Sequence, residues 1–177
     1  MKSRLTASDL ARTGLFAALI IVCTHLSIPM PSGVPLTLQT FAVALGGFLL
    51  GPVYGTLAVA VYLLLGAAGL PVFSGFTGGI GRFVGPTGGF LWGFLLLACG
   101  CGLGRDRTLP LRLLPGVAGL LLCHLLGALW YAYTAGLTFP AAALAVSLPF
   151  LPKDLASLIL ALAFARLLEK RGILKKP

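Results

Sequence analysis

Residues 37–68 read "TLQTFAVALGGFLLGPVYGTLAVAVYLLLGAA" and contain no charged side chain. Gly51-Pro52 divides this apolar stretch into two halves, 37–50 and 53–68. A helix that crosses a bilayer needs about 20 apolar residues, within a range of about 17–25, so each half is short for a span. Whether the stretch makes one span or two decides the side of the membrane on which every later loop lies.

The composition of the chain is that of an integral membrane protein. Of its 177 residues, 58% are hydrophobic and 10% are charged, whereas soluble domains carry roughly 25% charged residues. A small soluble domain keeps too much surface to bury so much apolar side chain. The net charge of +9 therefore indicates cytoplasmic loops of a protein surrounded by membrane lipid, and no nucleic acid is expected as a partner.

The distribution of Lys and Arg favours two spans in the opening stretch. We expect spans at about 10–28, 37–50, 53–68, 88–103, 113–134 and 153–168. With cytoplasmic termini, this arrangement places eleven basic residues inside and only Arg82 and Lys153 outside. Five spans would place five inside and eight outside, or eight inside and five outside if the N-terminus were outside. Because Lys and Arg favour cytoplasmic loops, this division favours six spans. The sequence therefore predicts an all-α integral membrane protein in which residues 1–177 form one domain, a bundle of six transmembrane helices with the N- and C-termini cytoplasmic.

The sequence offers little support for an enzyme. It has four acidic residues, and no two share one face of the predicted bundle as acid–base catalysis would need. Nucleophile-elbow, HExxH and Walker A lysine motifs do not occur in it. The four cysteines lie in or at the ends of apolar stretches without the spacing of zinc ligands. We therefore expect no catalytic residues, no metal site and no cofactor.

The glycine-rich stretch "GRFVGPTGGF" (81–90) lies in the predicted outer segment 69–87 and the start of the fourth span. It lacks the lysine of a phosphate-binding loop. Its glycines would let the backbone approach a ligand closely, and Thr87 is placed to cap the fourth span. Free N–H groups at a helix start favour an anionic or carbonyl group. The spacing alone leaves a ligand contact and a simple ordered cap equally open.

A second outer motif is "PFLPKDLASLI" (149–159), with Lys153 and Asp154 at the start of the sixth span. Ionisable residues inside a membrane bundle are functional candidates. The alternative is that Asp154 interacts with the helix dipole while Lys153 extends to the membrane surface. Tyr131 belongs to an interfacial aromatic belt or to a pocket wall. His124, near the middle of the fifth span, is expected to be a hydrogen-bonded structural residue.

The order and spacing of several motifs resemble the BioY family. These are "VPLTLQT" (34–40), "GLPVF" (69–73), "GPTGG" (85–89) and "LPFLPKDLASLILA" (148–161). Members of that family are biotin-binding substrate components of energy-coupling factor transporters. The resemblance implies an outward-facing biotin pocket under the loop between the third and fourth spans. It also implies a transmembrane coupling subunit and two cytoplasmic ATPases as partners, in the cell inner or plasma membrane.

Together, the outer motifs and the resemblance predict a set of substrate-binding residues: Asp154, Lys153, Arg82, Gly85, Pro86, Thr87, Gly88, Phe73, Gln39 and Tyr131. The family pattern at the sixth span is P-G-D-x-x-K, but here Lys153 replaces the glycine and Ser157 replaces the lysine. Because a buried carboxylate without a cation is costly, we expect Lys153 or Arg82 to replace the missing lysine. A substrate component for another small vitamin and a ligand-free structural membrane subunit remain alternatives.

Overall fold

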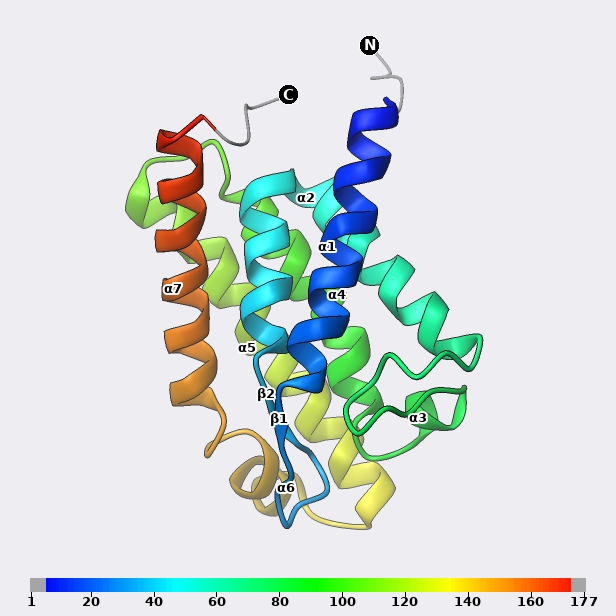
Figure 1. Ribbon diagram of the computed structural model, residues 1–177. Helices are drawn as coiled ribbons and strands as arrows, with labels where there is room; N and C mark the ends of the chain where they lie inside the picture. Colours follow the sequence, from blue (N-terminus) through cyan, green and yellow to red (C-terminus); the bar gives the residue numbers. More distant parts are fainter. Residues whose placement is uncertain (1–5, 173–177) are drawn as a thin grey trace.

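The computed structural model describes residues 6–172, which fold mainly into helices (Figure 1). The helices are α1 (Ala7–His25), α2 (Gln39–Ala67), α3 (Gly81–Val84), α4 (Gly88–Leu103), α5 (Leu109–Ala135), α6 (Phe139–Val146) and α7 (Leu151–Lys170). Strands β1 (Ser27–Ile28) and β2 (Leu36–Thr37) form a short antiparallel pair with Ser27 opposite Thr37. Four residues that the charge count placed inside, Lys2, Arg4, Lys175 and Lys176, lie outside the described residues.

Helix α2 is broken at the Gly51-Pro52 dipeptide that the sequence singles out. Gly51 has φ 83° and ψ −179°, a backbone conformation that glycine adopts without steric cost. The chain turns there, and Figure 1 shows the two arms of α2, residues 39–50 and 52–67, meeting at the top of the view. A Cβ added to Gly55 would lie 2.8 Å from Gly47 Cα, so the arms are in close contact beside the turn.

A buried arginine fixes this turn to two other helices. In a continuous helix the Phe48 carbonyl would accept a hydrogen bond from residue 52, but Pro52 has no N–H group. Arg112 Nη2 donates to this carbonyl over 3.0 Å instead. The same guanidinium donates to both carboxylate oxygens of Glu169, over 2.9 and 2.7 Å. The start of α5 and the end of α7 are thereby joined to the turn in α2.

Helices α4 and α5 pack closely because glycines line their contact. A Cβ on Gly93 would lie 2.7 Å from Cys123 Cα, and one on Gly119 would lie 2.8 Å from the Leu96 carbonyl oxygen. Helices in lipid associate mainly through such close packing of small residues, since lipid gives no hydrophobic drive between them. The α4–α5 pair therefore forms the centre against which the first arm of α2 also packs.

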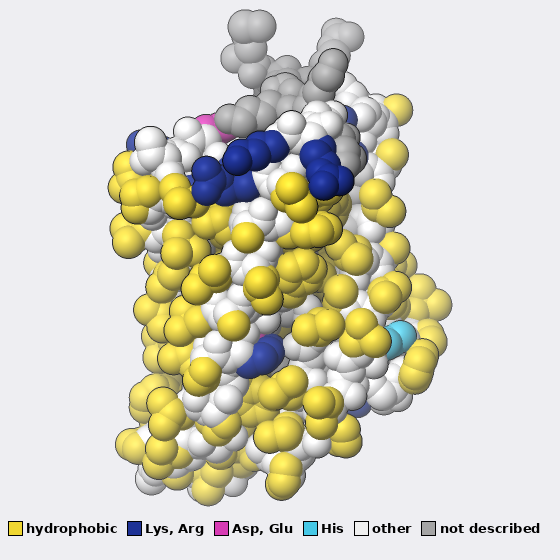
Figure 2. Space-filling model, turned by 60° about the vertical axis from the view of Figure 1, so that its left-hand side comes forward, with side chains coloured by type: hydrophobic (Ala, Val, Ile, Leu, Met, Phe, Trp, Pro, Cys, Tyr) yellow, Lys and Arg dark blue, Asp and Glu magenta, His cyan; other side chains and the backbone are white. Residues whose placement is uncertain are grey.

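The start of α1 and the end of α7 lie at the same end of the molecule (Figure 1). Figure 2 shows Lys and Arg side chains gathered near this end, above a largely apolar surface. The basic residues of the α4–α5 connection and the last turns of α7 belong to this end: Arg105, Arg107, Arg166, Lys170 and Arg171. With an even number of spans, the start of α1 and the end of α7 lie on the same side of the membrane. That this side is the cytoplasm remains a prediction.

The helices identify a multi-pass membrane protein. Within residues 6–172, three helices are long and apolar enough to cross a bilayer, namely α1, α2 and α5; α6 and α7, bent by 55°, make a fourth candidate if counted as one span. Helix α4 is apolar but shorter. The number six therefore remains a prediction that depends on counting α4 and the two arms of α2 as separate spans.

Three segments differ from the sequence expectation. Residues 135–152, expected to be irregular, contain α6, and the outer segment 69–87 contains the short α3. The first span was expected to reach residue 28, but α1 ends at His25 and the chain enters β1. The all-α description therefore omits one small β-ladder. The segment that connects its two strands contains three prolines and one glycine between residues 29 and 35.

Candidate ligand-binding pocket

A cavity lies toward the end of the bundle opposite the basic residues. Its walls come from the end of α1, the starts of α2, α4 and α7, the middle of α5, and the connecting segments. The empty volume is about 720 Å³, which includes space open to solvent. Because it is concave and only partly open to solvent, the cavity is a candidate site for a small organic ligand.

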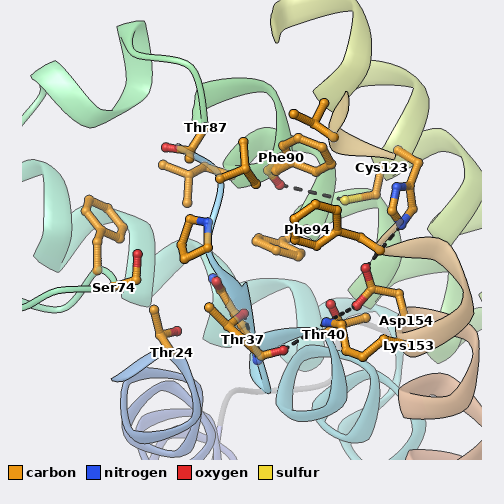
Figure 3. A pocket seen from close by; sticks show the side chains of 18 of the residues that line it. Thr24, Thr37, Thr40, Ser74, Thr87, Phe90, Phe94, Cys123, Lys153 and Asp154 are labelled. Atoms are coloured by element: carbon orange, nitrogen blue, oxygen red, sulfur yellow. Dashed lines mark hydrogen bonds and ion pairs between the residues drawn. The ribbon is translucent and has the colours of Figure 1, made fainter. Parts of the chain in front are cut away.

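The cavity has aromatic walls interrupted by a few polar groups (Figure 3). The aromatic side chains are Tyr62, Phe73, Phe90, Phe94 and Phe150, and the neutral polar ones are Thr24, Thr37, Gln39, Thr40, Ser74 and Thr87. Gln39 Nε2 donates to Tyr62 Oη over 3.1 Å, which fixes both side chains. The Phe73 ring packs on Gly66, where an added Cβ would lie 2.1 Å from Phe73 Cζ. Gly66 is thus required for this aromatic wall.

A buried charged cluster forms one side of the cavity. Asp154 lies in the first turn of α7, where the helix dipole favours a carboxylate. Its side chain is 9% exposed, and Lys153 Nζ contacts its Oδ1. Lys153 Nζ also donates to the Thr37 carbonyl over 2.8 Å. From α5, His124 Nε2 lies 3.2 Å from Asp154 Oδ2, so two helices hold the carboxylate.

A second cationic group lies on the other side of the cavity. Arg82, in α3, donates from Nε to Thr77 Oγ1 over 2.9 Å and from Nη2 to the Ser74 carbonyl over 3.5 Å. Figure 3 shows Ser74 and Asp154 on opposite sides of the pocket. Within residues 6–172, Arg82 takes part in none of the ion pairs. The cavity therefore has a carboxylate on one side and a guanidinium without a carboxylate partner on the other.

The structure brings six of the ten predicted site residues to the cavity: Asp154, Lys153, Arg82, Thr87, Phe73 and Gln39. The other four, Gly85, Pro86, Gly88 and Tyr131, are not among its lining residues. Tyr131 Oη instead donates to the Ser32 carbonyl over 3.0 Å, and the Gly85 carbonyl accepts from Trp130 Nε1 over 2.9 Å. Tyr131 and Gly85 therefore link neighbouring segments and do not line the cavity.

The expected capping role of Thr87 is wrong. Thr87 is the residue before α4, but its side chain makes no capping hydrogen bond. Its φ of −88° and ψ of −6° are helical, whereas a capping side chain needs the extended backbone that points its oxygen at the first N–H groups. The Thr87 side chain lines the cavity instead.

His124 is the site residue that sequence reasoning undervalued. It was expected to be a hydrogen-bonded structural histidine; in the structure its Nε2 lies 3.2 Å from Asp154 Oδ2 and the residue lines the cavity. The two residues are far apart in the sequence, and only the packing of α5 against α7 joins them. A polar side chain in the middle of an apolar span was the one available signal.

Similarity to known proteins agrees with this architecture. The sequence model of the BioY family matches residues 1–173. The chain belongs to the BioY family. A probable biotin transporter BioY of Pyrococcus horikoshii is 39% identical, with 92% of this chain and 97% of that protein covered. The biotin transporter BioY of Rhodobacter capsulatus is 42% identical, with 86% and 88% covered.

A solved structure shares the fold. The crystal structure of the S-component for biotin from an ECF-type ABC transporter superimposes with a TM-score of 0.85 at 28% sequence identity. The match covers 96% of this chain and 95% of that chain. The helical bundle of this BioY protein is therefore that of an S-component.

Proposed function

We propose that this BioY protein is the biotin-binding subunit of a vitamin uptake transporter, a substrate-binding component and not an enzyme. The observation that carries the proposal is the cavity, where Asp154 and Ser74 lie on opposite sides (Figure 3) and the Arg82 guanidinium donates to the Ser74 carbonyl. Its relatives named biotin transporters and the shared S-component fold support the same substrate.

The chemistry of biotin suits this arrangement of groups. Biotin has a ureido ring with two N–H donors at one end, an apolar thioether ring in the middle, and a valerate carboxylate at the other end. A carboxylate such as Asp154 accepts N–H groups through charge-assisted hydrogen bonds, and a guanidinium binds a carboxylate in the same way. Aromatic side chains such as Phe90 and Phe94 would cover the apolar ring between these ends.

In this proposal the two cations near the cavity have different partners: Lys153 pairs with Asp154, and Arg82 binds the ligand. Lys153 is already engaged by Asp154 and by the Thr37 carbonyl. It therefore replaces the lysine that the family pattern has at position 157. Arg82 keeps its charge unpaired among the described residues and is the group that would bind the valerate carboxylate.

Transport requires partners that this chain does not contain. The sequence carries no Walker A motif, so we propose that a transmembrane coupling subunit and two cytoplasmic ATPases supply the energy. In this arrangement the protein lies in the cell inner or plasma membrane with the cavity facing outward. The ECF-type transporter of the structural neighbour supports such an assembly.

The proposal is tested by equilibrium binding to the purified protein in detergent or nanodiscs. Titration calorimetry with biotin should give saturable binding at one site, and biotin should raise the unfolding temperature because it binds only the folded state. Thiamine and riboflavin serve as controls and should do neither. Binding of another vitamin in place of biotin would overturn the assignment of the substrate. Absence of any binding would favour a ligand-free structural subunit.

A further inference from the structure

The histidine beside Asp154 is held rigidly. His124 is 6% exposed, and its ring meets Phe90 edge to face, with the ring centroids 5.9 Å apart and the planes at 87°. Its backbone carbonyl accepts a hydrogen bond from Ser147 Oγ over 3.3 Å. By contrast, Lys153 reaches Asp154 through a long flexible side chain on the same helix. His124 is therefore the fixed contact of the carboxylate and Lys153 the adaptable one.

The contact with Asp154 requires a proton on one particular nitrogen of the His124 ring. Nδ1 is buried and has no hydrogen-bond partner among residues 6–172. A carboxylate oxygen only accepts hydrogen bonds, so the ring nitrogen that faces it must carry a proton. The ring that fits this contact carries a proton on Nε2, 3.2 Å from Asp154 Oδ2.

We propose that His124 is a positioning residue for substrate recognition. Its Nε2–H donates to Asp154 Oδ2, while Lys153 contacts Oδ1. Contacts at both oxygens restrain the orientation of the carboxylate, and Oδ1, which has no hydrogen-bond partner among the described residues, keeps lone pairs for the ligand. Although His124 lines the cavity, its Nδ1 is covered and its Nε2 faces Asp154, so it acts on the polar groups of the ligand through the carboxylate. This inference rests on the proposed biotin site.

Two substitutions separate this role from simple packing. His124→Gln keeps an N–H donor near the position of Nε2, whereas His124→Leu keeps the bulk but removes the donor. We expect biotin affinity within about threefold of wild type for the Gln variant and at least about tenfold weaker for the Leu variant. Leu122→Ala, on the exposed face of the same helix, is the control and should bind like wild type. Equal affinities for the Gln and Leu variants would overturn the inference.

The contact between His124 and Asp154 can also be tested without biotin, by a measurement on the ligand-free protein. Nitrogen NMR of ¹⁵N-histidine-labelled protein in membranes, with His25→Gln to remove the other histidine, should show a ring protonated at Nε2. The signal should shift in the Asp154→Asn variant. A ring protonated at Nδ1 alone, or a signal that Asp154→Asn does not change, would overturn the inference even if biotin binds. Failure of wild type to bind biotin would instead contradict the proposed function, and the NMR result would still decide the role of His124.

Discussion

At the scale of single residues, Lys153 occupies an unusual place for the cation of a buried pair. It precedes Asp154 in the sequence, and its Nζ reaches back to contact the carboxylate and the Thr37 carbonyl. Ser157, one helical turn later, is buried and carries no charge. Positions 153 and 157 are four residues apart, so they share one face of α7. A lysine at either position could therefore approach Asp154.

Removing Lys153 should destabilise the protein, and a lysine at 157 should restore much of the loss. Lys153→Met leaves Asp154 as a buried charge with no cation, and we expect the free energy of unfolding to fall by about 3 kcal/mol. Lys153→Met combined with Ser157→Lys supplies a new cation on the same face. Chemical unfolding in detergent measures both variants, with Lys170→Met at the exposed end of α7 as the control. A double variant no more stable than the single one would contradict this pairing.

Arg82 should contribute to binding only for ligands that carry a carboxylate. We expect Arg82→Ala to weaken biotin binding by about tenfold to a hundredfold, because a charge-assisted hydrogen bond contributes about 1.5–3 kcal/mol. Biotin methyl ester has no carboxylate, so the substitution should change its affinity little. Titration of both ligands into both proteins gives the comparison. Equal losses for the acid and the ester would show that Arg82 supports the loop and does not bind the carboxylate.

The charged part of the site was predictable because charges are scarce in this chain. Only Arg82 and Lys153 among the basic residues lie on the predicted outer side, and Asp154 is their acidic neighbour. His124 could not be assigned in the same way, since its relation to Asp154 depends on how α5 packs on α7. Tyr131 was predicted as a possible wall because of its place on α5, but the direction of its side chain follows from the fold.

At the scale of elements, the turn in α2 depends on a contact that no local pattern reveals. Gly51-Pro52 marks the break in the sequence, but the Phe48 carbonyl that Pro52 frees is satisfied by Arg112, distant in the chain. Glu169 balances the charge of that arginine, which is 6% exposed. One guanidinium therefore fixes the geometry between α2, α5 and α7.

Substitutions at this contact should show an uncompensated charge. Arg112→Leu leaves both the Phe48 carbonyl and the Glu169 carboxylate without their donor, and we expect a loss of about 3 kcal/mol in unfolding free energy. Arg112→Leu with Glu169→Leu removes the orphaned carboxylate and should be less destabilised than the single variant. Arg166→Leu, an exposed arginine on α7, should change stability by less than about 0.5 kcal/mol. Equal stability of the single and double variants would contradict the proposed charge balance.

Long apolar elements were predictable from hydropathy, whereas the short ones were not. Helix α4 covers 88–103, the range expected for the fourth span, because its apolar stretch has sharp glycine and basic boundaries. Helix α6 was missed because three prolines between 140 and 152 indicated irregular chain; Pro140, however, stands in the first turn of α6, where a missing N–H costs nothing. The β1–β2 ladder has only two residues per strand, too few for a periodic signal.

At the scale of the whole molecule, the basic end of the bundle (Figure 2) lies opposite the end at which α1 finishes and α2 and α7 begin (Figure 1), which supplies residues that line the cavity. Positive residues favour the cytoplasmic side, which gives the bundle a direction. A ligand entering the cavity would then come from outside, and partners that hydrolyse ATP would act at the basic end. The direction and the number of spans are separate questions, and labelling of single cysteines can answer both.

Single cysteines introduced after replacing Cys23, Cys99, Cys101 and Cys123 by alanine should report orientation. Thr108 and Thr138 are a matched pair, since both are exposed, precede helices and make no side-chain capping bond. A membrane-impermeant maleimide added to intact cells should label Thr138→Cys and should label Thr108→Cys only after permeabilisation. The reverse pattern would invert the bundle and place the cavity on the cytoplasmic side.

The same labelling decides whether residues 37–68 cross the membrane twice. Ile28 in β1 and Leu70 after α2 are both exposed, at 62% and 47%, and they flank the stretch on either side. If the arms 39–50 and 52–67 are two spans, both Ile28→Cys and Leu70→Cys should be labelled from outside. A single span would put them on opposite sides, so only one would react. Because Gly51 reverses the chain and Gly55 packs on Gly47, we expect both to react; one protected site would reduce the bundle to five crossings.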